Sequence, residues 1–268
     1  MHTVACQPKV AMNSKVLEKF DLILKCFTAT SPRWTATDIA NQLKTPVSTL
    51  HGILADMVEM DFLLFSPVSK EYSIGYRQLE MGALYANNFE LINIGLGIMH
   101  ELLYNVSYMG GLSIIYKGWM YLVTVTMPVR NMTGYKHSGP RMPPHMSAGG
   151  KAMLAHMPGD VLERYYGLDW EQSWVAASVK RNDLEHEFEL IRSQGYALDR
   201  AFGSAKAPEV IAAPIFGKSG QILSALSLVE PETGFPKSSL EDTLGFLIPA
   251  VNEITLRCSH IVLPESYV

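Results

Sequence analysis

The amino-acid sequence predicts a mixed α/β chain of the α+β type, with a small helical N-terminal domain and a larger domain built on an antiparallel sheet. In the N-terminal part, apolar residues recur at helical spacing from Val16 to Val58. Further along, two apolar segments fold back at Lys117-Gly118 and at Lys218-Ser219-Gly220, with the β-branched residues and turn residues of hairpins. At 268 residues the chain is long enough for two separate cores.

The first domain is expected to contain three short helices. The first helix repeats apolar residues on one face, namely Val16, Leu17, Phe20, Ile23, Leu24 and Phe27. Thr35 followed by Asp38 is a capping box that opens a second, short helix. Pro46 at the first helical position, behind Thr45 as cap, opens the third. The third helix is expected to bury Val47, Leu50, Ile53, Leu54, Met57 and Val58.

Two short strands follow the third helix, at residues 62–65 and 71–74, joined by a turn that contains Pro67 and Ser69. Three helices and a hairpin in about 65 residues are the plan of a winged helix-turn-helix, in which the third helix enters the major groove of DNA. The candidate DNA contacts are Ser48, Thr49 and His51 on its outward face, Lys44 at its entrance, and Arg33 and Lys70 as phosphate clamps. The alternative interpretation is a solvated polar face.

Charge argues for weak nonspecific DNA binding. Residues 1–75 hold seven Lys and Arg against seven Asp and Glu, and the whole chain has a formal net charge of −4. Without an excess of positive charge, nonspecific affinity should be weak and salt-sensitive. Gly52, in the middle of the third helix, also lowers helix stability by about 1 kcal/mol relative to Ala.

The remainder is expected to form a linker helix and one larger domain. The helical stretch from Tyr76 is expected to break near Asn87-Asn88. We therefore expect a DNA-binding domain at residues 1–75, a linker helix at 76–88, and an effector-binding and oligomerisation domain at 89–268. Helices at residues 160–166 and 182–194 and a final helix at about 236–257 accompany the two hairpins. An antiparallel sheet with helices beside it can leave a pocket for a small molecule on one face.

The stretch HMSAGGKAMLA, residues 145–155, is not a phosphate-binding loop. His145 stands where such a loop needs its first glycine, and Ala152 stands where it needs a hydroxyl. A Ser-x-x-Lys nucleophile is excluded because Gly150 occupies the lysine position. The stretch instead predicts a helix capped by Ser147, with glycines that allow another segment to come close.

Other classes of protein fit the sequence poorly. Three cysteines without a Cys-x-x-Cys pair argue against a disulfide framework and a zinc site, and the eight histidines are scattered, His137 and His145 being the nearest to a ligand pair. We expect no metal and no cofactor. No apolar stretch reaches the length of a membrane span and no signal peptide is recognisable, so a cytoplasmic protein is expected.

With both halves considered, the sequence resembles the IclR family of bacterial transcriptional regulators, from about Val16 to Arg257. The resemblance rests on STLHGIL, YSIGYRQLEMG, HMSAGGKAMLA, and GYALD followed by VIAAPIFGKSGQILSALSL, in this order. It implies a winged helix-turn-helix followed by a GAF-like effector-binding domain, in a homodimer or a dimer of dimers that binds double-stranded operator DNA. It also implies that Gly52 replaces the arginine of a typical relative, which removes a possible DNA contact.

The resemblance further implies an effector pocket. Ala148 and Gly149 would face the effector through their backbone. Asp199 and Ser227 occupy two further positions of the family's pattern of pocket residues. Two positions depart from it: Val210 stands where relatives have a cysteine, and Val229 where some have a second polar group. Because unpaired polar atoms are costly to bury, a pocket with few of them should prefer an apolar ligand. We hypothesise an aromatic carboxylic acid or amide, with Trp119, Met127, Met142 and Met146 as walls or, alternatively, as ordinary core.

We therefore predict a ligand-responsive regulator of a catabolic operon, not an enzyme, with repression or activation left open. An enzyme remains the first alternative, because Ser147, His145, Lys151 and Asp199 fall in the pocket region. A second alternative is a sensor that has lost DNA binding, as the neutral first domain and Gly52 suggest.

Overall fold

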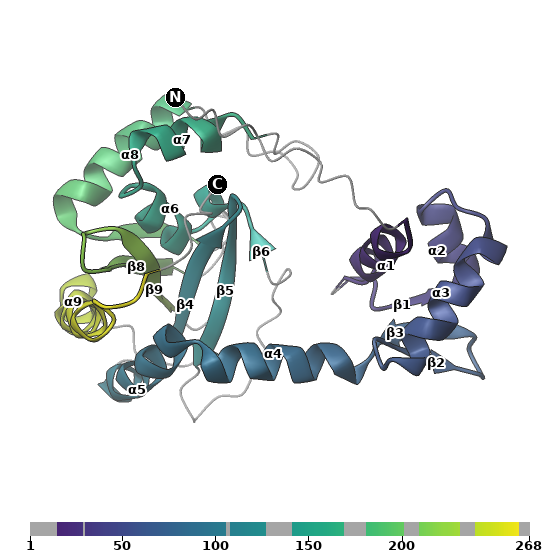
Figure 1. The fold of residues 1–268 in the computed structure, drawn as a ribbon. Coiled ribbons are helices and arrows are strands. Elements are labelled where there is room, and N and C mark those ends of the chain that lie inside the picture. The colour runs from purple at the N-terminus through teal and green to yellow at the C-terminus, as the bar shows by residue number, and fades with distance from the viewer. Residues whose placement is uncertain are drawn as a thin grey trace. The chain divides into compact units, whose positions relative to one another are not determined.

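The computed structural model describes residues 15–28, 30–105, 108–126, 141–168, 181–200, 209–230 and 239–262. These residues form two compact units that divide between Asn88 and Phe89 (Figure 1). The helix expected to be a linker, residues 76–88, belongs to the first unit.

The first unit is a winged helix-turn-helix, as predicted. Its elements are α1 (Lys15–Cys26), β1 (Arg33–Thr35), α2 (Ala36–Gln42), α3 (Val47–Glu59), β2 (Leu63–Ser66), β3 (Glu71–Ile74) and α4 (Tyr76–Asn88). The strands form an antiparallel sheet in the order β1-β3-β2, with Arg33 and Leu64 both paired to Ser73. Strand β1 was not predicted, because three residues are too few to show an alternating pattern.

The core of the first unit lies between the three helices and the sheet. Ile23, Ile39, Leu50, Leu54, Met57 and Leu63 are fully buried. Phe20 of α1 meets Phe62 edge to face, with ring centroids 4.9 Å apart. Of the face predicted for α3, three residues are buried and Val47, Ile53 and Val58 are partly buried, which confirms the helical register.

The helix caps confirm one prediction and correct another. The Thr35 hydroxyl accepts a hydrogen bond from Asp38 N (3.2 Å), and the Asp38 carboxylate accepts one from Thr35 N (3.3 Å), as a capping box requires. The expected Thr45 cap is wrong: Pro46 is the N-cap and α3 begins at Val47. Thr45 N–H instead donates to Ala40 O (3.0 Å), which closes the end of α2 and turns the Thr45 hydroxyl toward Leu43 O (3.1 Å).

The first turn of α4 is fixed to the rest of the first unit. A Cβ on Gly75 would lie 2.1 Å from Asp61 O, so only glycine permits this close approach. Gln78 Nε2 and Gly75 N each donate to Phe62 O at 2.9 Å. Beyond this turn α4 buries no residue.

The second unit is an antiparallel six-stranded sheet between two layers of helices. Its elements are α5 (Glu90–Asn105), β4 (Met109–Tyr116), β5 (Trp119–Thr126), β6 (Arg141–Met142), the 3-10 turn η1 (Pro144–Met146), α6 (Ala148–Leu154), α7 (Gly159–Tyr166), α8 (Arg181–Gln194), β7 (Ala197–Arg200), β8 (Glu209–Phe216), β9 (Ile222–Val229) and α9 (Leu240–Arg257). The strand order is β6-β5-β4-β9-β8-β7. Both predicted hairpins are present; β6 and β7 were not predicted as strands.

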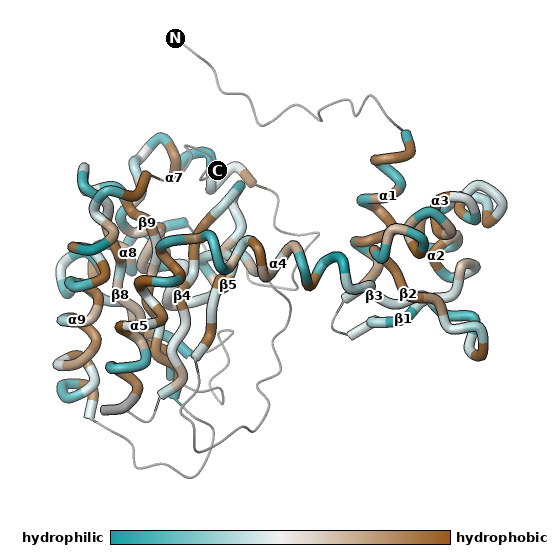
Figure 2. The backbone as a smooth tube through the Cα atoms, turned by 60° about the horizontal axis from the view of Figure 1, so that its bottom comes forward, coloured by the Kyte–Doolittle hydropathy of each residue, from teal (hydrophilic) through white to brown (hydrophobic). Residues whose placement is uncertain are grey.

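Alternation along the strands separates the two faces of this sheet. Ile211, Ala213 and Ile215 of β8 pack in a core with α5 and α9, whereas Val210 and Ala212 pack in a second core with α6 and α8. Hydrophobic and hydrophilic residues alternate along α9, as expected of a helix that covers a sheet on one side (Figure 2). Among the described residues, no helix has both the length and the apolar character needed to cross a membrane.

Candidate functional site

The start of α6 rests directly on the sheet. Ser147 caps the helix by accepting a hydrogen bond from Gly150 N at 3.0 Å, which confirms the predicted helix start. A Cβ on Gly150 would lie 2.0 Å from Pro144 O. A Cβ on Gly149 would lie 2.7 Å from Ser227 Oγ and 2.9 Å from Ser113 Oγ. A side chain at Gly150 would therefore collide with backbone, and one at Gly149 would force the two serine hydroxyls to move.

Two serines lie under Gly149 on neighbouring strands. Ser113 of β4 and Ser227 of β9 are 1% and 9% exposed. The Ser113 hydroxyl donates to Ala225 O over a long 3.4 Å contact, so this hydroxyl is only weakly tied to the sheet. Ser227 was predicted and Ser113 was not. The sequence signal for Ser113 was a polar residue in an otherwise apolar strand, two positions after Gly111.

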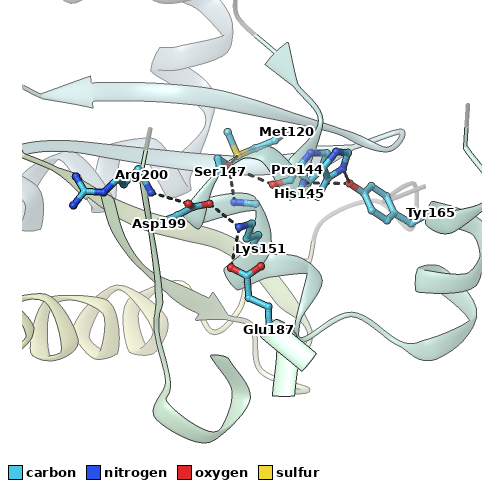
Figure 3. Close-up of polar contacts among 10 residues, drawn as sticks. Met120, Pro144, His145, Ser147, Lys151, Tyr165, Glu187, Asp199 and Arg200 are labelled. Carbon is cyan, nitrogen blue, oxygen red and sulfur yellow. Dashed lines mark hydrogen bonds and ion pairs between the residues drawn. The ribbon is translucent and has the colours of Figure 1, made fainter. Parts of the chain in front are cut away.

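A charged cluster joins α6 to two other elements (Figure 3). Lys151 Nζ lies 2.6 Å from Asp199 Oδ2 on β7 and 2.8 Å from Glu187 Oε1 on α8. Burial by itself would lower the pKa of Lys151, but hydrogen bonds and charges from Asp199 and Glu187 outweigh it and raise the pKa. The other oxygen of Asp199 accepts a hydrogen bond from Arg200 N at 2.7 Å. The predicted pocket residue Asp199 is thus an ion-paired carboxylate.

Beside the cluster, a buried histidine faces a buried tyrosine. His145 Nδ1 lies 2.6 Å from the Tyr165 hydroxyl, and His145 N–H donates to the same oxygen at 3.2 Å. Burial, followed by the positive charge of Lys151, lowers the pKa of His145 from 6.5 to about 4. Burial raises the pKa of Tyr165. His145 is therefore neutral at pH 7, and the tyrosine can donate its proton to Nδ1.

Most of the predicted effector residues in the described part of the chain gather on the α6 face of the sheet. Seven of them line this side or pack against its core, namely Ala148, Gly149, Asp199, Val210, Ser227, Val229 and Met142. Met146 lies half-buried in η1. Val210 pairs directly with both Val229 and Asp199. Trp119 directly precedes Met120 in β5, and Met120 packs in the core that contains α6. Because side chains alternate along a strand, Trp119 points away from that face. Met127 lies outside the described residues.

The predicted DNA contacts lie on the surface of the first unit. Ser48, Thr49, His51 and Gly52 are exposed on α3, and a Cβ on Gly52 would meet nothing within 4 Å. Lys44 and Lys70 are exposed and have positive φ, 49° and 58°. The Arg33 side chain is 71% exposed, with Nη1 4.0 Å from Glu71 Oε2.

A metal centre is not apparent in the described ranges, where no group of three or more His, Cys, Asp or Glu side chains gathers. Cys26 and Cys258 are buried free thiols. Ser147 is engaged as a cap, and its hydroxyl also lies 3.0 Å from Met120 Sδ. The alternative interpretation of Ser147 as a nucleophile gains no support from these contacts.

Comparison with known proteins gives consistent results over both units. Residues 83–256 match the family model of the bacterial transcriptional regulator IclR C-terminal domain, and residues 16–67 match the IclR helix-turn-helix domain. The HTH-type transcriptional regulator KdgR of Escherichia coli is 23% identical over 231 residues, which is 84% of this chain and 85% of KdgR.

Two solved structures share the fold. IclR of Thermotoga maritima superposes with a TM-score of 0.66 at 20% identity, covering 92% of this chain and 98% of that one. An IclR homolog of Microbacterium hydrocarbonoxydans, solved with 4-hydroxybenzoate, superposes with a TM-score of 0.73 at 21% identity, covering 90% and 98%.

Proposed function

The chain belongs to the IclR family and is a ligand-responsive, DNA-binding transcriptional regulator; on that premise we propose that it controls a catabolic operon in response to an aromatic carboxylic acid or amide. It acts in the cytoplasm on operator DNA, as a homodimer or dimer of dimers, and catalyses no reaction. The matched relatives are regulators rather than enzymes, which supports the last point.

The outward face of α3 supports the DNA-binding part of the proposal. Ser48, Thr49 and His51 are exposed while the opposite face of the helix is buried in the core. A helix anchored in this way can enter the major groove and present short polar side chains to base edges. Arg33, Lys44 and Lys70 then bind phosphates on either side and set the register of the helix.

The α6 face of the second unit supports the choice of effector. Val210, Val229 and Met142 are apolar residues of this face, and its polar groups are the two serines under Gly149 and the Lys151 cluster. An aromatic ring suits such apolar neighbours, and a carboxylate or amide suits donors such as serine hydroxyls. Because Lys151 pairs with Asp199, an anionic effector meets no unpaired carboxylate at that position. The Microbacterium homolog solved with 4-hydroxybenzoate makes that compound the first to test.

Helix α4 supports a homodimer. Tyr76, Leu79, Ala83 and Ala86 follow one another at spacings of three, four and three residues, the pattern of a coiled-coil seam. Tyr76 and Leu79 are 64% and 70% exposed, and α4 buries none of its residues within the chain. A second copy of α4 would cover this stripe, and two winged helices would then bind paired half-sites.

One observation carries the proposal: α3 presents an exposed polar face, while its opposite face is buried in the core of the first unit. The second unit of the same chain matches the C-terminal domain of IclR regulators. The test is a fluorescence-anisotropy titration against DNA from upstream of the gene itself and of its neighbours, with and without 4-hydroxybenzoate, benzoate and benzamide. We expect selective binding that at least one of these ligands alters. Ligand binding without selective DNA binding would favour the sensor alternative, and turnover of a ligand would favour the enzyme.

A further inference from the structure

Helix α9 buries one side in the second unit and leaves its other side open to solvent. The inner side packs in the core with α5, through Leu247, Ala250, Val251 and Ile254. On the outer side, Phe246, Pro249 and Leu256 are exposed, Phe246 to 42% and Leu256 to 75%. In both views α9 lies at the edge of the second unit (Figures 1 and 2). The outer side therefore presents apolar surface over three turns of the helix.

We propose that α9 forms a second interface between copies of this chain, in which it packs antiparallel against α9 of another copy about a two-fold axis near Pro249. The inference rests on the homodimer through α4 proposed above, and it assigns the contact that turns such a dimer into a dimer of dimers. Each α4 dimer carries two copies of α9, so two dimers joined through both pairs form a closed tetramer.

The charges at the two ends of α9 complement each other in an antiparallel pair. The first turn carries Glu241 and Asp242, and the last turn carries Arg257. An antiparallel partner brings each acidic first turn to a basic last turn and also opposes the two helix dipoles. Arg257 is paired with Glu253 of its own helix, but both side chains are about half exposed, and such surface pairs are weak. A parallel partner would instead place like charges together.

The outer side also matches itself in shape. Gly245 is exposed, and a Cβ there would meet nothing within 4 Å, so the space above it is open. The midpoint between Gly245 and Leu256 falls just after Ala250, and the midpoint between Asp242 and Arg257 falls just before it. One two-fold axis therefore brings Leu256 of each copy over Gly245 of the other and Arg257 of each copy to Asp242 of the other. A large side chain over a glycine is knob-into-hole packing.

A single α9 pair is a small contact, because its apolar part consists of a few side chains around a glycine. Two pairs act together once α4 holds two copies of the chain in one dimer, since the second contact then forms within a single assembly. Association through α9 therefore depends on the α4 dimer. A chain that cannot dimerise through α4 should stay monomeric at concentrations where the wild type is tetrameric.

Sedimentation velocity of the full chain over a wide range of concentration tests the interface. The wild type should change from dimer to tetramer as its concentration rises, and Leu256→Glu should remain a dimer throughout. Leu190→Glu is the matched control. Leu190 is 53% exposed on α8, which packs in the core on the other face of the sheet, so this variant should behave as the wild type.

A charge exchange tests the antiparallel arrangement. Asp242→Lys and Arg257→Glu should each lower the fraction of tetramer, and a chain that carries both should recover it. Within one helix the two positions are about 22 Å apart, so recovery requires a contact between copies. The N-cap bond from Asp242 N to Ser239 Oγ (3.1 Å) uses the backbone of residue 242 and is retained in the variants. Circular dichroism confirms that each variant is folded.

The outcomes separate this interface from the function proposed above. A wild type that stays dimeric at every concentration, or a tetramer that persists in Leu256→Glu, would overturn the α9 contact and leave the α4 homodimer standing. Loss of the tetramer in Leu190→Glu as well would also overturn it, because the effect would then follow added negative charge. A double charge variant that does not recover would overturn the antiparallel pairing, and a monomeric wild type would overturn both interfaces. These samples contain no DNA and no ligand, so the test of regulation stays independent.

Discussion

Lys151 Nζ lies 2.6 Å from Asp199 Oδ2, and this contact joins the helix under the proposed effector site to the edge strand of the sheet. The same ammonium group reaches Glu187 on α8 at 2.8 Å. One lysine thereby ties three elements that are distant in the sequence. Because the side chains of Lys151 and Asp199 are only 12% and 19% exposed, the pair is shielded from solvent far more than a surface ion pair.

Replacing Lys151 by methionine should destabilise the second unit. Removal of one partner from a buried ion pair costs about 3–5 kcal/mol, and the partial exposure of this cluster reduces the expected loss to about 2 kcal/mol. Urea unfolding of the full chain, followed by circular dichroism, measures the effect. A cycle with Asp199→Asn gives the control: the double variant should lose less than the sum of the single losses, and additive losses would contradict a direct pairing.

Stability should fall on acidification through His145. The pKa of this group is about 4 in the folded chain and about 6.5 when unfolded, so the unfolded state binds a proton first as pH falls. The contribution of His145 to the free energy of unfolding is fully present above pH 6.5 and is lost between pH 6.5 and 4. The total loss is about 3 kcal/mol. Melting temperatures from pH 7.5 to 4.5 measure it. His145→Gln should flatten this dependence, and an unchanged pH profile in the variant would assign the loss to other groups.

Gly149→Ala should destabilise the chain through two identified contacts. The new Cβ would lie 2.7 Å from Ser227 Oγ and 2.9 Å from Ser113 Oγ, both too close. Overpacking of this kind costs about 1–3 kcal/mol. In a chain that also carries Ser113→Ala and Ser227→Ala, the same change should cost clearly less, because both oxygens are gone. Equal losses in the two backgrounds, measured by thermal unfolding, would show that other atoms resist the substitution.

Gly52→Arg should raise both helix stability and DNA affinity. The position is exposed, a Cβ there meets nothing within 4 Å, and arginine is a better helix former than glycine by about 0.8 kcal/mol. The added guanidinium should steepen the slope of log K for DNA binding against log salt concentration by about 0.9 for each protomer bound. Gly52→Gln is the uncharged control and should give the gain in stability alone. Equal salt slopes for the two variants would place residue 52 away from the DNA.

Leu79→Glu should weaken dimerisation if α4 supplies the seam. The leucine is 70% exposed in the single chain, and two glutamates facing each other across a seam would repel. Met81→Glu is the matched control, since Met81 is also exposed on α4 but lies nearly opposite Leu79 around the helix. Sedimentation velocity should detect a shift to monomer for Leu79→Glu alone. A shift in both variants, or in neither, would argue against this seam.

The sequence by itself determined the parts of the protein that local chemistry specifies. The apolar spacing of α3, the capping box at Thr35 and Asp38, and the turn at Lys117-Gly118 each involve residues a few positions apart, and each was predicted correctly. The cap of α3 was not, because the hydrogen bond from Thr45 N to Ala40 O competes for the same stretch of chain.

Only the tertiary structure decided which side chains meet. Strand β1, with three residues, is too short to show a pattern, and both β1 and β7 are defined by the strands that they pair with. The sequence singled out Asp199, but the Lys151 ammonium beside it and the carboxylate of Glu187, 36 residues from that lysine, come together only through packing of α6, α8 and β7. Likewise Ser113 and Ser227 meet at Gly149 because two strands and a helix close on one point. A periodic pattern encodes which face of an element is buried, whereas the neighbours on that face are set by how the elements pack.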